Sequence, residues 1–366
     1  MAAESFKILR RPLAIALLGT GYFAAARLGL LLATVHGSVS PVWPATGVAI
    51  AALILGGQRM WPGVALGAFL ANALTPVPLV AVAGIAAGNT LEAVVGAWLF
   101  AQCGAVLRRW QFDHVAAPVA FAAAALAAPL VSASCGVLCL GGSGAISWPI
   151  AGTLWQTWWV GDALGALIVA PFLVALRASL RARRPWNARL ALKAALLAGI
   201  TAMICRLVFF QPVGTEFLFA VFPMLLLAVA WFGSTGVALT ALVISGVGIS
   251  AAFFGSGPFV GDSLNSELLH LQLFLTSVGI AALVLPIYRA VGSLVLPGAV
   301  LLAGWTLSGW LFSSLYHDRL NDDAGKFRAL TVDVANSIHS FPAGTIRGCA
   351  PRWRGIVRRH KIGWGG

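Results

Sequence analysis

Four ionisable side chains interrupt the long apolar runs of this 366-residue chain: Arg27, Glu92, Asp162 and Arg206. An ionisable residue inside a membrane span is energetically costly, so each of them is a functional hypothesis by default. Two acids and two bases in such runs predict mutual ion pairs that fix the order of the helices. The first pair to test joins Arg27 to Glu92 or Asp162.

A small-ligand, ion or proton site is the alternative interpretation of the same residues. Polar and aromatic side chains accompany the two acids in the sequence, namely Asn89, Trp155, Trp158 and Trp159. Together with Glu92 and Asp162 they would form a polar site walled by indole rings. Arg206 fits a third role, in which its guanidinium faces a lipid headgroup. The residues alone leave these alternatives open.

The composition places the chain in a membrane. Hydrophobic residues make up 60% of it and charged residues only 10%, with a mean hydropathy of +0.91, whereas soluble domains carry about 25% charged residues. The net charge of +13 does not indicate a nucleic-acid partner. The arginines lie between apolar runs, as the positive-inside rule predicts for cytoplasmic loops.

No catalytic motif stands out. The sequence contains no Walker loop, no GxSxG elbow, no HExxH and no CxxC pair, which are the patterns expected of common enzyme and metal sites. The five cysteines are interpreted as small buried helix residues. We therefore predict no catalytic residue, no metal site, no cofactor and no enzymatic activity.

The apolar runs predict an all-α, polytopic transmembrane helical bundle of about 10–11 spans. The predicted spans are 12–35, 42–56, 61–74, 79–101, 115–139, 149–176, 190–210, 217–231, 236–254, 268–288 and 294–315. The second and third form a hairpin, in which Trp43-Pro44 and Trp61-Pro62 begin the helices and Gly56-Gly57 and Arg59 form the turn. Both are short for a full crossing, so tilt, bilayer thinning or burial in the bundle is expected.

Basic residues predict the orientation. Residues 1–11 form a cytoplasmic N-terminus, and the arginine-bearing loops, including that of Arg289, lie inside. Residues from His317 onward then lie outside a bacterial inner membrane. Small-xxx-small spacings, such as Gly63/Gly67 and Gly161/Gly165, predict close contacts between helix backbones.

Three stretches resemble one family. They are SPVWPATGVAIAALILGGQRMWPGVALGAFLANAL at 40–74, AAGNTLEAVVGAWLF at 86–100 and WWVGDALGALIVAPFLVAL at 158–176. Each is similar to the MASE1 (membrane-associated sensor) domain of bacteria. The resemblance covers most of residues 12–290, and the predicted MASE1-like domain spans residues 12–315. It implies an integral-membrane input module of signalling proteins, of the kind that precedes histidine kinase, PAS, GGDEF or EAL domains. It implies no ligand residues.

The C-terminal residues suggest two further segments. YHDRLNDDAGKFRALTVDVANSIHS, residues 316–340, resembles the start of a CHASE domain, an extracytoplasmic ligand-sensing domain. Residues 341–366 lack a helical period and cluster Arg, Gly and Trp. We expect them to be out of frame after a frameshift that truncated a longer sensor, and the alternative is a disordered basic tail.

The sequence thus predicts the membrane sensory input module of a histidine kinase or a GGDEF/EAL cyclic-di-GMP protein, without its output domain. The alternative function is a small-solute or ion transporter of the inner membrane. The expected partners are the lipid bilayer, an unidentified small ligand, and another membrane protein or a second copy of the chain.

Overall fold

The computed structural model describes residues 2–31, 40, 42–102, 116–182, 185, 187–211, 214–260 and 264–291, and the isolated residues Thr306, Ser313 and Arg328. The chain divides into two units, Met1–Phe312 and Ser313–Gly366, and all the helices below belong to the first. The predicted span 294–315, the CHASE-like segment 316–340 and the tail 341–366 lie outside the described residues, except for those three.

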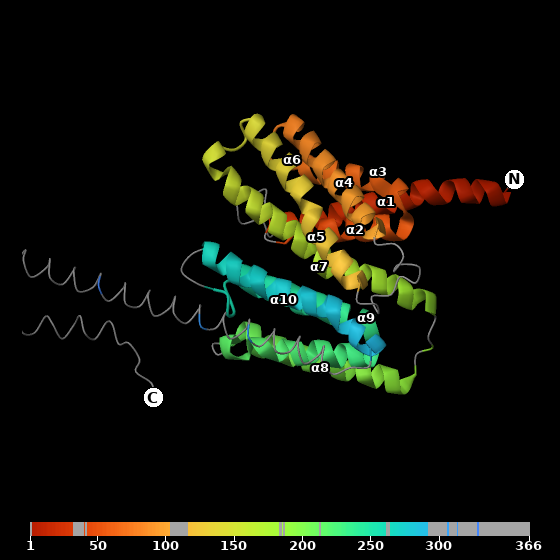
Figure 1. Cartoon of the computed structure of the whole chain (residues 1–366), viewed down its shortest axis with the longest axis vertical. Helices are drawn as coiled ribbons and strands as arrows, with labels where there is room; N and C mark the ends of the chain where they lie inside the picture. Colours follow the sequence, from red (N-terminus) through yellow and green to blue (C-terminus); the bar gives the residue numbers. More distant parts are fainter. Residues whose placement is uncertain are drawn as a thin grey trace, which may run out of the picture. The chain divides into compact units, whose positions relative to one another are not determined.

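The described residues are helical and contain no strand, so the predicted all-α class is confirmed. Ten α-helices follow one another (Figure 1): α1 Ala2–Leu31, α2 Pro44–Gly56, α3 Trp61–Ala73, α4 Leu79–Gln102, α5 Ala116–Ala127, α6 Pro129–Gly142, α7 Ala151–Ala182, α8 Ala188–Phe210, α9 Val221–Phe253 and α10 Leu264–Val291. Three short 3₁₀ helices, Gln58–Met60, Trp148–Ile150 and Gly214–Ala220, join some of them.

Seven helical stretches in the described part of the chain are long and apolar enough to cross a membrane. The predicted count was higher for three reasons. The helices α2 and α3 have 13 residues each, and 217–253 is one continuous stretch. The last predicted span is not described.

Several helix ends differ from the prediction. The first helix begins at Ala2, well before residue 12, and α7 continues to Ala182 rather than ending at 176. The predicted span 115–139 is divided into α5 and α6. Pro129, the first residue of α6, lacks the amide hydrogen that would continue α5.

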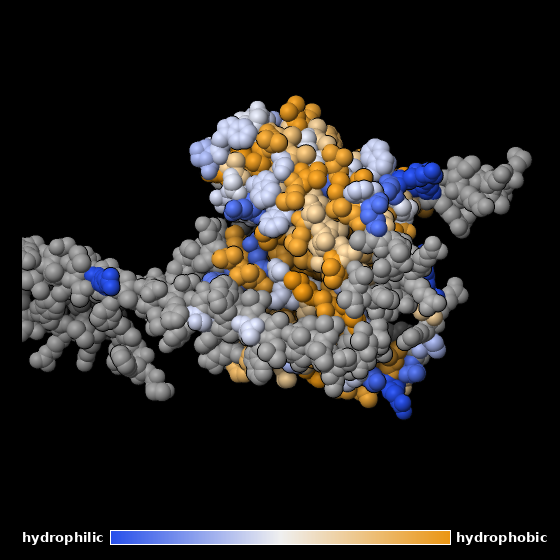
Figure 2. All heavy atoms as spheres, in the orientation of Figure 1, coloured by the Kyte–Doolittle hydropathy of each residue, from blue (hydrophilic) through white to orange (hydrophobic). Residues whose placement is uncertain are grey.

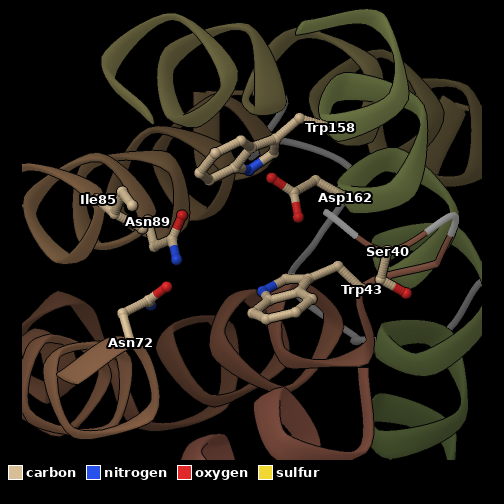
Figure 3. A pocket seen from close by; sticks show the side chains of 7 residues that line it. All are labelled: Ser40, Trp43, Asn72, Ile85, Asn89, Trp158 and Asp162. Atoms are coloured by element: carbon tan, nitrogen blue, oxygen red, sulfur yellow. The ribbon is translucent and has the colours of Figure 1, made fainter. Parts of the chain in front are cut away.

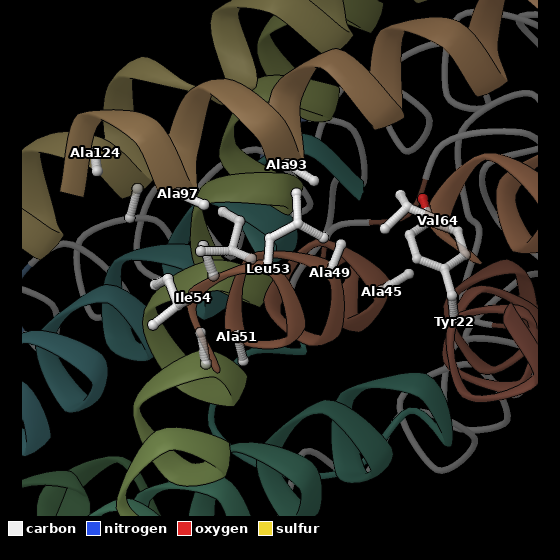
Figure 4. Packing of buried hydrophobic residues seen from close by; sticks show 14 of the residues in the cluster. Tyr22, Ala45, Ala49, Ala51, Leu53, Ile54, Val64, Ala93, Ala97 and Ala124 are labelled. Atoms are coloured by element: carbon white, nitrogen blue, oxygen red, sulfur yellow. The ribbon is translucent and has the colours of Figure 1, made fainter. Parts of the chain in front are cut away.

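The two short helices and the turn between them form as predicted, but α2 and α3 do not pack on each other as a hairpin, because each packs against α1 and α4 instead. Gly57, with φ +85°, ends α2 in a conformation that favours glycine, and Arg59 lies in the 3₁₀ turn before α3. At 1.5 Å per residue, α2 spans about 20 Å, less than the roughly 30 Å of a bilayer core. It is nevertheless buried, and Figure 4 shows its Ala49 and Leu53 beneath Ala93 and Ala97 of α4.

Glycines let α1 and α3 approach closely, as the spacing of Gly63 and Gly67 predicts. A Cβ atom at Gly63 would lie 2.6 Å from the carbonyl oxygen of Ile15, and one at Gly67 would lie 2.6 Å from that of Gly19. Because real Cβ atoms do not come this close to backbone atoms, only glycine allows this contact.

The chain reverses direction inside α9. Gly233 has φ 66° and ψ −151°, which no α-helix contains. A Cβ atom at Gly236 would lie 2.7 Å from the carbonyl oxygen of Ala228, whereas eight residues of straight helix span about 12 Å. The backbone thus turns back at Gly233, between the predicted segments 217–231 and 236–254, and α9 is a helical hairpin. By length and hydropathy 217–253 still counts as one stretch, so two separate crossings stay a prediction.

Gly233→Ala is therefore expected to destabilise the protein by about 1–2 kcal/mol, because this region of backbone conformation is essentially restricted to glycine. Gly246→Ala is the control, since Gly246 lies in the second half of α9 with open space around it. It should be neutral or slightly stabilising. The measurement is the thermal midpoint of the purified protein in detergent. Equal midpoints for the two variants would contradict the reversal.

Apolar side chains gather on the face shown in Figure 2, between paler and hydrophilic residues. Many large apolar side chains are exposed, such as Leu17, Val80 and Phe254. Contiguous apolar surface of this kind marks an interaction with lipid or protein. The helices form two groups. One core cluster joins α1–α5 and α7, another joins α7–α10, and so α7 is shared between them.

Candidate functional site

The amino end of α2 is inserted against the middle of α7. The backbone N–H of Trp43 donates a 2.9 Å hydrogen bond to the carbonyl oxygen of Gly161. A Cβ atom at Gly165 would collide with the carbonyl group of Trp43, and one at Gly47 would collide with the carbonyl oxygen of Gly165. The predicted close approach at Gly161/Gly165 is therefore confirmed, and the partner is the start of α2.

The backbone that leads into α2 is non-helical and buried. Ser40, Val42 and Trp43 precede the helix without regular structure, and each is less than a tenth exposed. In a membrane protein, irregular backbone at membrane depth occurs where it is buried in protein or lines a cavity. This segment does both, because Ser40 and Trp43 line the pocket described below.

Thr46, in the first turn of α2, lies between the two intramembrane acids. Its Oγ1 is 3.0 Å from Oδ1 of Asp162 in α7 and 3.4 Å from Oε2 of Glu92 in α4. A hydroxyl has one proton to donate, so the shorter contact to Asp162 is the stronger one. Ser132 of α6 donates to the other oxygen of Asp162 at 2.7 Å. One cluster thus joins four helices.

The acid cluster is buried. Thr46, Glu92, Ser132 and Asp162 are each at most 2% exposed. The carboxyl groups of Glu92 and Asp162 are near neighbours, and Oε1 of Glu92 makes no hydrogen bond among the described residues. Buried polar groups nearly always have a partner, so this free oxygen requires an explanation.

A small pocket opens beside the cluster (Figure 3). It has room for about one water-sized group and is lined by Ser40, Trp43, Asn72, Ile85, Asn89, Trp158 and Asp162. In Figure 3 the carboxyl group of Asp162 and the amide of Asn89 point into this space from opposite sides, with the two indole rings between them. The lining is therefore polar at its centre and aromatic at its walls.

Further polar atoms around the pocket have no hydrogen bond to the described residues. They are Oδ1 of Asn89, Nε1 of Trp43 and the hydroxyl of Tyr22. The Tyr22 hydroxyl, on α1, is near both Trp43 and Asn89. All three side chains are more than nine-tenths buried, so bulk water does not satisfy them. The arrangement is that of a polar site able to bind a small group.

Comparison with known families decides what kind of protein carries this site. Residues 14–291, most of the chain, match the MASE1 family. The chain belongs to the MASE1 family. No curated protein and no solved structure matches the chain. A MASE1 domain is a membrane-associated sensory domain of signalling proteins, so this multi-pass chain carries a sensory rather than a catalytic domain.

The structure brings together only part of the polar site predicted from the sequence. Asn89, Glu92, Trp158 and Asp162 surround the cluster and its pocket. Trp155 and Trp159 lie elsewhere on α7. Their rings stack on each other at 5.9 Å, and they donate hydrogen bonds to Ser134 Oγ and to the carbonyl oxygen of Leu126.

The predicted pairing of Arg27 with Glu92 or Asp162 is not found. Among the residues that the structure describes, both acids interact with hydroxyl groups and with each other, and neither forms an ion pair. Arg27 is half-buried on α1 and Arg206 is exposed on α8. The position of Arg206 on the exterior agrees with the lipid-facing alternative.

Sequence reasoning missed Thr46 and Ser132, which contact the acids directly, and Tyr22, Trp43 and Asn72, which surround the pocket. One signal was available. Thr46 follows a Trp-Pro pair at the start of a short helix, where its side chain lies beside unpaired amide groups. Ser132 had no such signal, because lone serines are common in membrane helices. No group of three or more His, Cys, Asp and Glu side chains gathers among the described residues.

Proposed function

We propose that this MASE1 chain is the sensory input module of a bacterial signal-transduction protein of the histidine kinase or GGDEF/EAL type. In this proposal it lies in the inner membrane with its N-terminus in the cytoplasm, and the acid cluster is its sensing site. The observation that carries the proposal is Thr46, whose hydroxyl reaches Asp162 and Glu92 at the junction of α2, α4 and α7. A change of ligand or charge there changes the contacts that hold the helices together.

The signal passes along α7 in this mechanism. Asp162 lies in α7, which packs against both helix groups. Near its end, the carbonyl oxygen of Ala175 accepts a 3.0 Å hydrogen bond from Thr235 in the α9 hairpin. A ligand shifts a two-state equilibrium only by its differential affinity for the two states. In this mechanism the two states differ in the hydrogen bonds between the hydroxyl and carboxyl groups of the cluster.

A chimera tests the proposal. A diguanylate cyclase domain is fused after Val291, the end of the family match and of α10, which the basic residues place in the cytoplasm. We expect Asp162→Asn and Thr46→Val each to change cyclic-di-GMP production about fivefold or more at equal protein amounts, the lower end of typical allosteric coupling. The Thr157→Val control should leave it unchanged, since Thr157 bonds only the carbonyl oxygen of Thr153. Unchanged output in every cluster variant would refute the sensory role.

Transport is the second candidate. One observation favours it: α2, which is too short to cross the bilayer core, begins at a buried polar cluster, and discontinuous helices of this kind build transporter substrate sites. Uptake into proteoliposomes separates the two functions. Solute-specific accumulation that Asp162→Asn abolishes would favour transport, whereas cyclase control without uptake would favour sensing.

A further inference from the structure

We propose that the pocket beside Asp162 binds a small monovalent cation, with oxygen ligands from Asp162, Glu92 and Asn89. This inference rests on the sensory site proposed above and names the chemical class of its ligand. It starts from three observations: the charge of the cluster, the unpaired acceptor atoms, and the size of the pocket.

The charge of the cluster is not balanced by protein. Glu92 and Asp162 are 1% and 0% exposed, and no described Lys or Arg forms an ion pair with either acid. A carboxyl group buried in a membrane is neutralised by a proton or paired with a counter-charge, and a cation competes with protons for this position. The amino end of α2, beside Thr46, supplies roughly half a positive charge, which is too little for two carboxylates. A cation in the pocket supplies the remainder.

Two unpaired acceptors lie close to Asp162: Asn89 lines the pocket with it, and Glu92 is its neighbour in the acid cluster. Oε1 of Glu92 and Oδ1 of Asn89 are buried and accept no hydrogen bond from the described residues. The two residues are three positions apart on α4, so their side chains share one face of the helix. Asp162, which lines the pocket with Asn89, brings the carboxyl group opposite. Carboxylate and amide oxygens are the ligands that hard cations prefer.

The size of the pocket selects among cations. Its space is that of about one water molecule, and the indole rings of Trp43 and Trp158 form part of its wall, so an organic ligand does not fit. A Ca²⁺ site needs six to eight oxygens, and Mg²⁺ retains several waters. Both oxygens of Asp162 already accept hydrogen bonds from Thr46 and Ser132. A singly charged ion sheds its hydration water at a much lower cost than a divalent ion, so it suits a site with so few protein oxygens.

The test is binding of radioactive sodium to the full-length chain in lipid nanodiscs, at constant ionic strength maintained with choline. We expect saturable binding that lithium or potassium displaces. Glu92→Gln and Asn89→Ala should each weaken it about tenfold or more, as loss of a ligand-shell residue typically does. Arg206→Gln is the control, because Arg206 is exposed on α8, and it should bind like the parent chain. Size-exclusion profiles establish that each variant is folded.

Absence of saturable sodium binding by the parent chain would overturn the inference. So would a sodium affinity of Glu92→Gln and Asn89→Ala equal to that of the parent chain. Asn89→Ala changes no charge, so it remains decisive if the acid variants fail to fold. The cyclase chimera separates this inference from the proposed function. If Asp162→Asn alters cyclase output while the parent chain binds no sodium, the sensory role stands without the cation. If sodium binds and no variant alters the output, the cation site stands and the sensory role fails.

Discussion

Gly165→Ala is expected to destabilise the protein by about 3 kcal/mol, the upper part of the range for overpacked sites. In most helices the same substitution stabilises, because alanine exceeds glycine in helix propensity by about 1 kcal/mol. At Gly165, however, the added methyl would collide with the carbonyl group of Trp43. Neither partner can yield easily, since both are backbone and Trp43 N is bonded to Gly161 O.

Gly199→Ala is the matched control for this prediction. Gly199 lies in the middle of α8 and has no heavy atom within 4 Å of a Cβ built there. It should gain the helix-propensity term and become slightly more stable. Thermal midpoints in detergent compare the two variants. A Gly165→Ala protein as stable as Gly199→Ala would show that α2 does not insert against α7 in this way.

The same contact shows what could be predicted from sequence and what could not. The spacing of Gly161 and Gly165 identifies a face of α7 that a backbone approaches closely. It does not identify the approaching chain, because many helices in a glycine-rich bundle would fit. The partner is the non-helical segment at Trp43, whose position depends on the packing of α2 against α4 and α7.

The sequence predicts the two acids of the site but not the side chains that contact them. A charge in an apolar run identifies Glu92 and Asp162 as important, since hydropathy gives their depth in the membrane. Hydropathy does not give the direction in which a side chain leaves its helix. Arg27 was therefore paired with the acids on depth alone, whereas the structure brings the hydroxyls of Thr46 and Ser132 to them.

The α9 hairpin was predicted from the distribution of arginines along the chain and not from the local sequence. Only a few residues separate the apolar runs 217–231 and 236–254, and composition alone does not divide them. The argument for two spans came from the positions of the arginines, and the positive φ of Gly233 supports it. At α2 and α3 the local signals were clear but misled the span count. The Trp-Pro starts and the Gly-Gly turn correctly predict two helices, but each helix has only 13 residues, too few for a span.

Thr46→Val is expected to destabilise the protein by about 2 kcal/mol, because a buried polar group left without its hydrogen-bond partner costs roughly 1–3 kcal/mol. Valine has nearly the shape of threonine and no hydroxyl. Its substitution leaves Oδ1 of Asp162 and Oε2 of Glu92 without their shared donor, and the burial of Thr46 keeps bulk water away. The loss of stability in Thr46→Val would therefore be due to the missing hydrogen bond and not to a packing defect.

Two companion variants make that assignment. Thr46→Ser retains the hydroxyl and deletes a methyl group, so it should recover most of the lost stability. Thr157→Val removes a hydroxyl that bonds only its own helix, at the carbonyl oxygen of Thr153, and should be close to neutral. The order of thermal midpoints in detergent is thus parent and Thr157→Val highest, Thr46→Ser next, and Thr46→Val lowest. If Thr46→Ser fell as far as Thr46→Val, packing by the methyl group and not the bond to the acids would hold α2 in place. The bridge between Glu92 and Asp162 could then not be the element that a ligand changes.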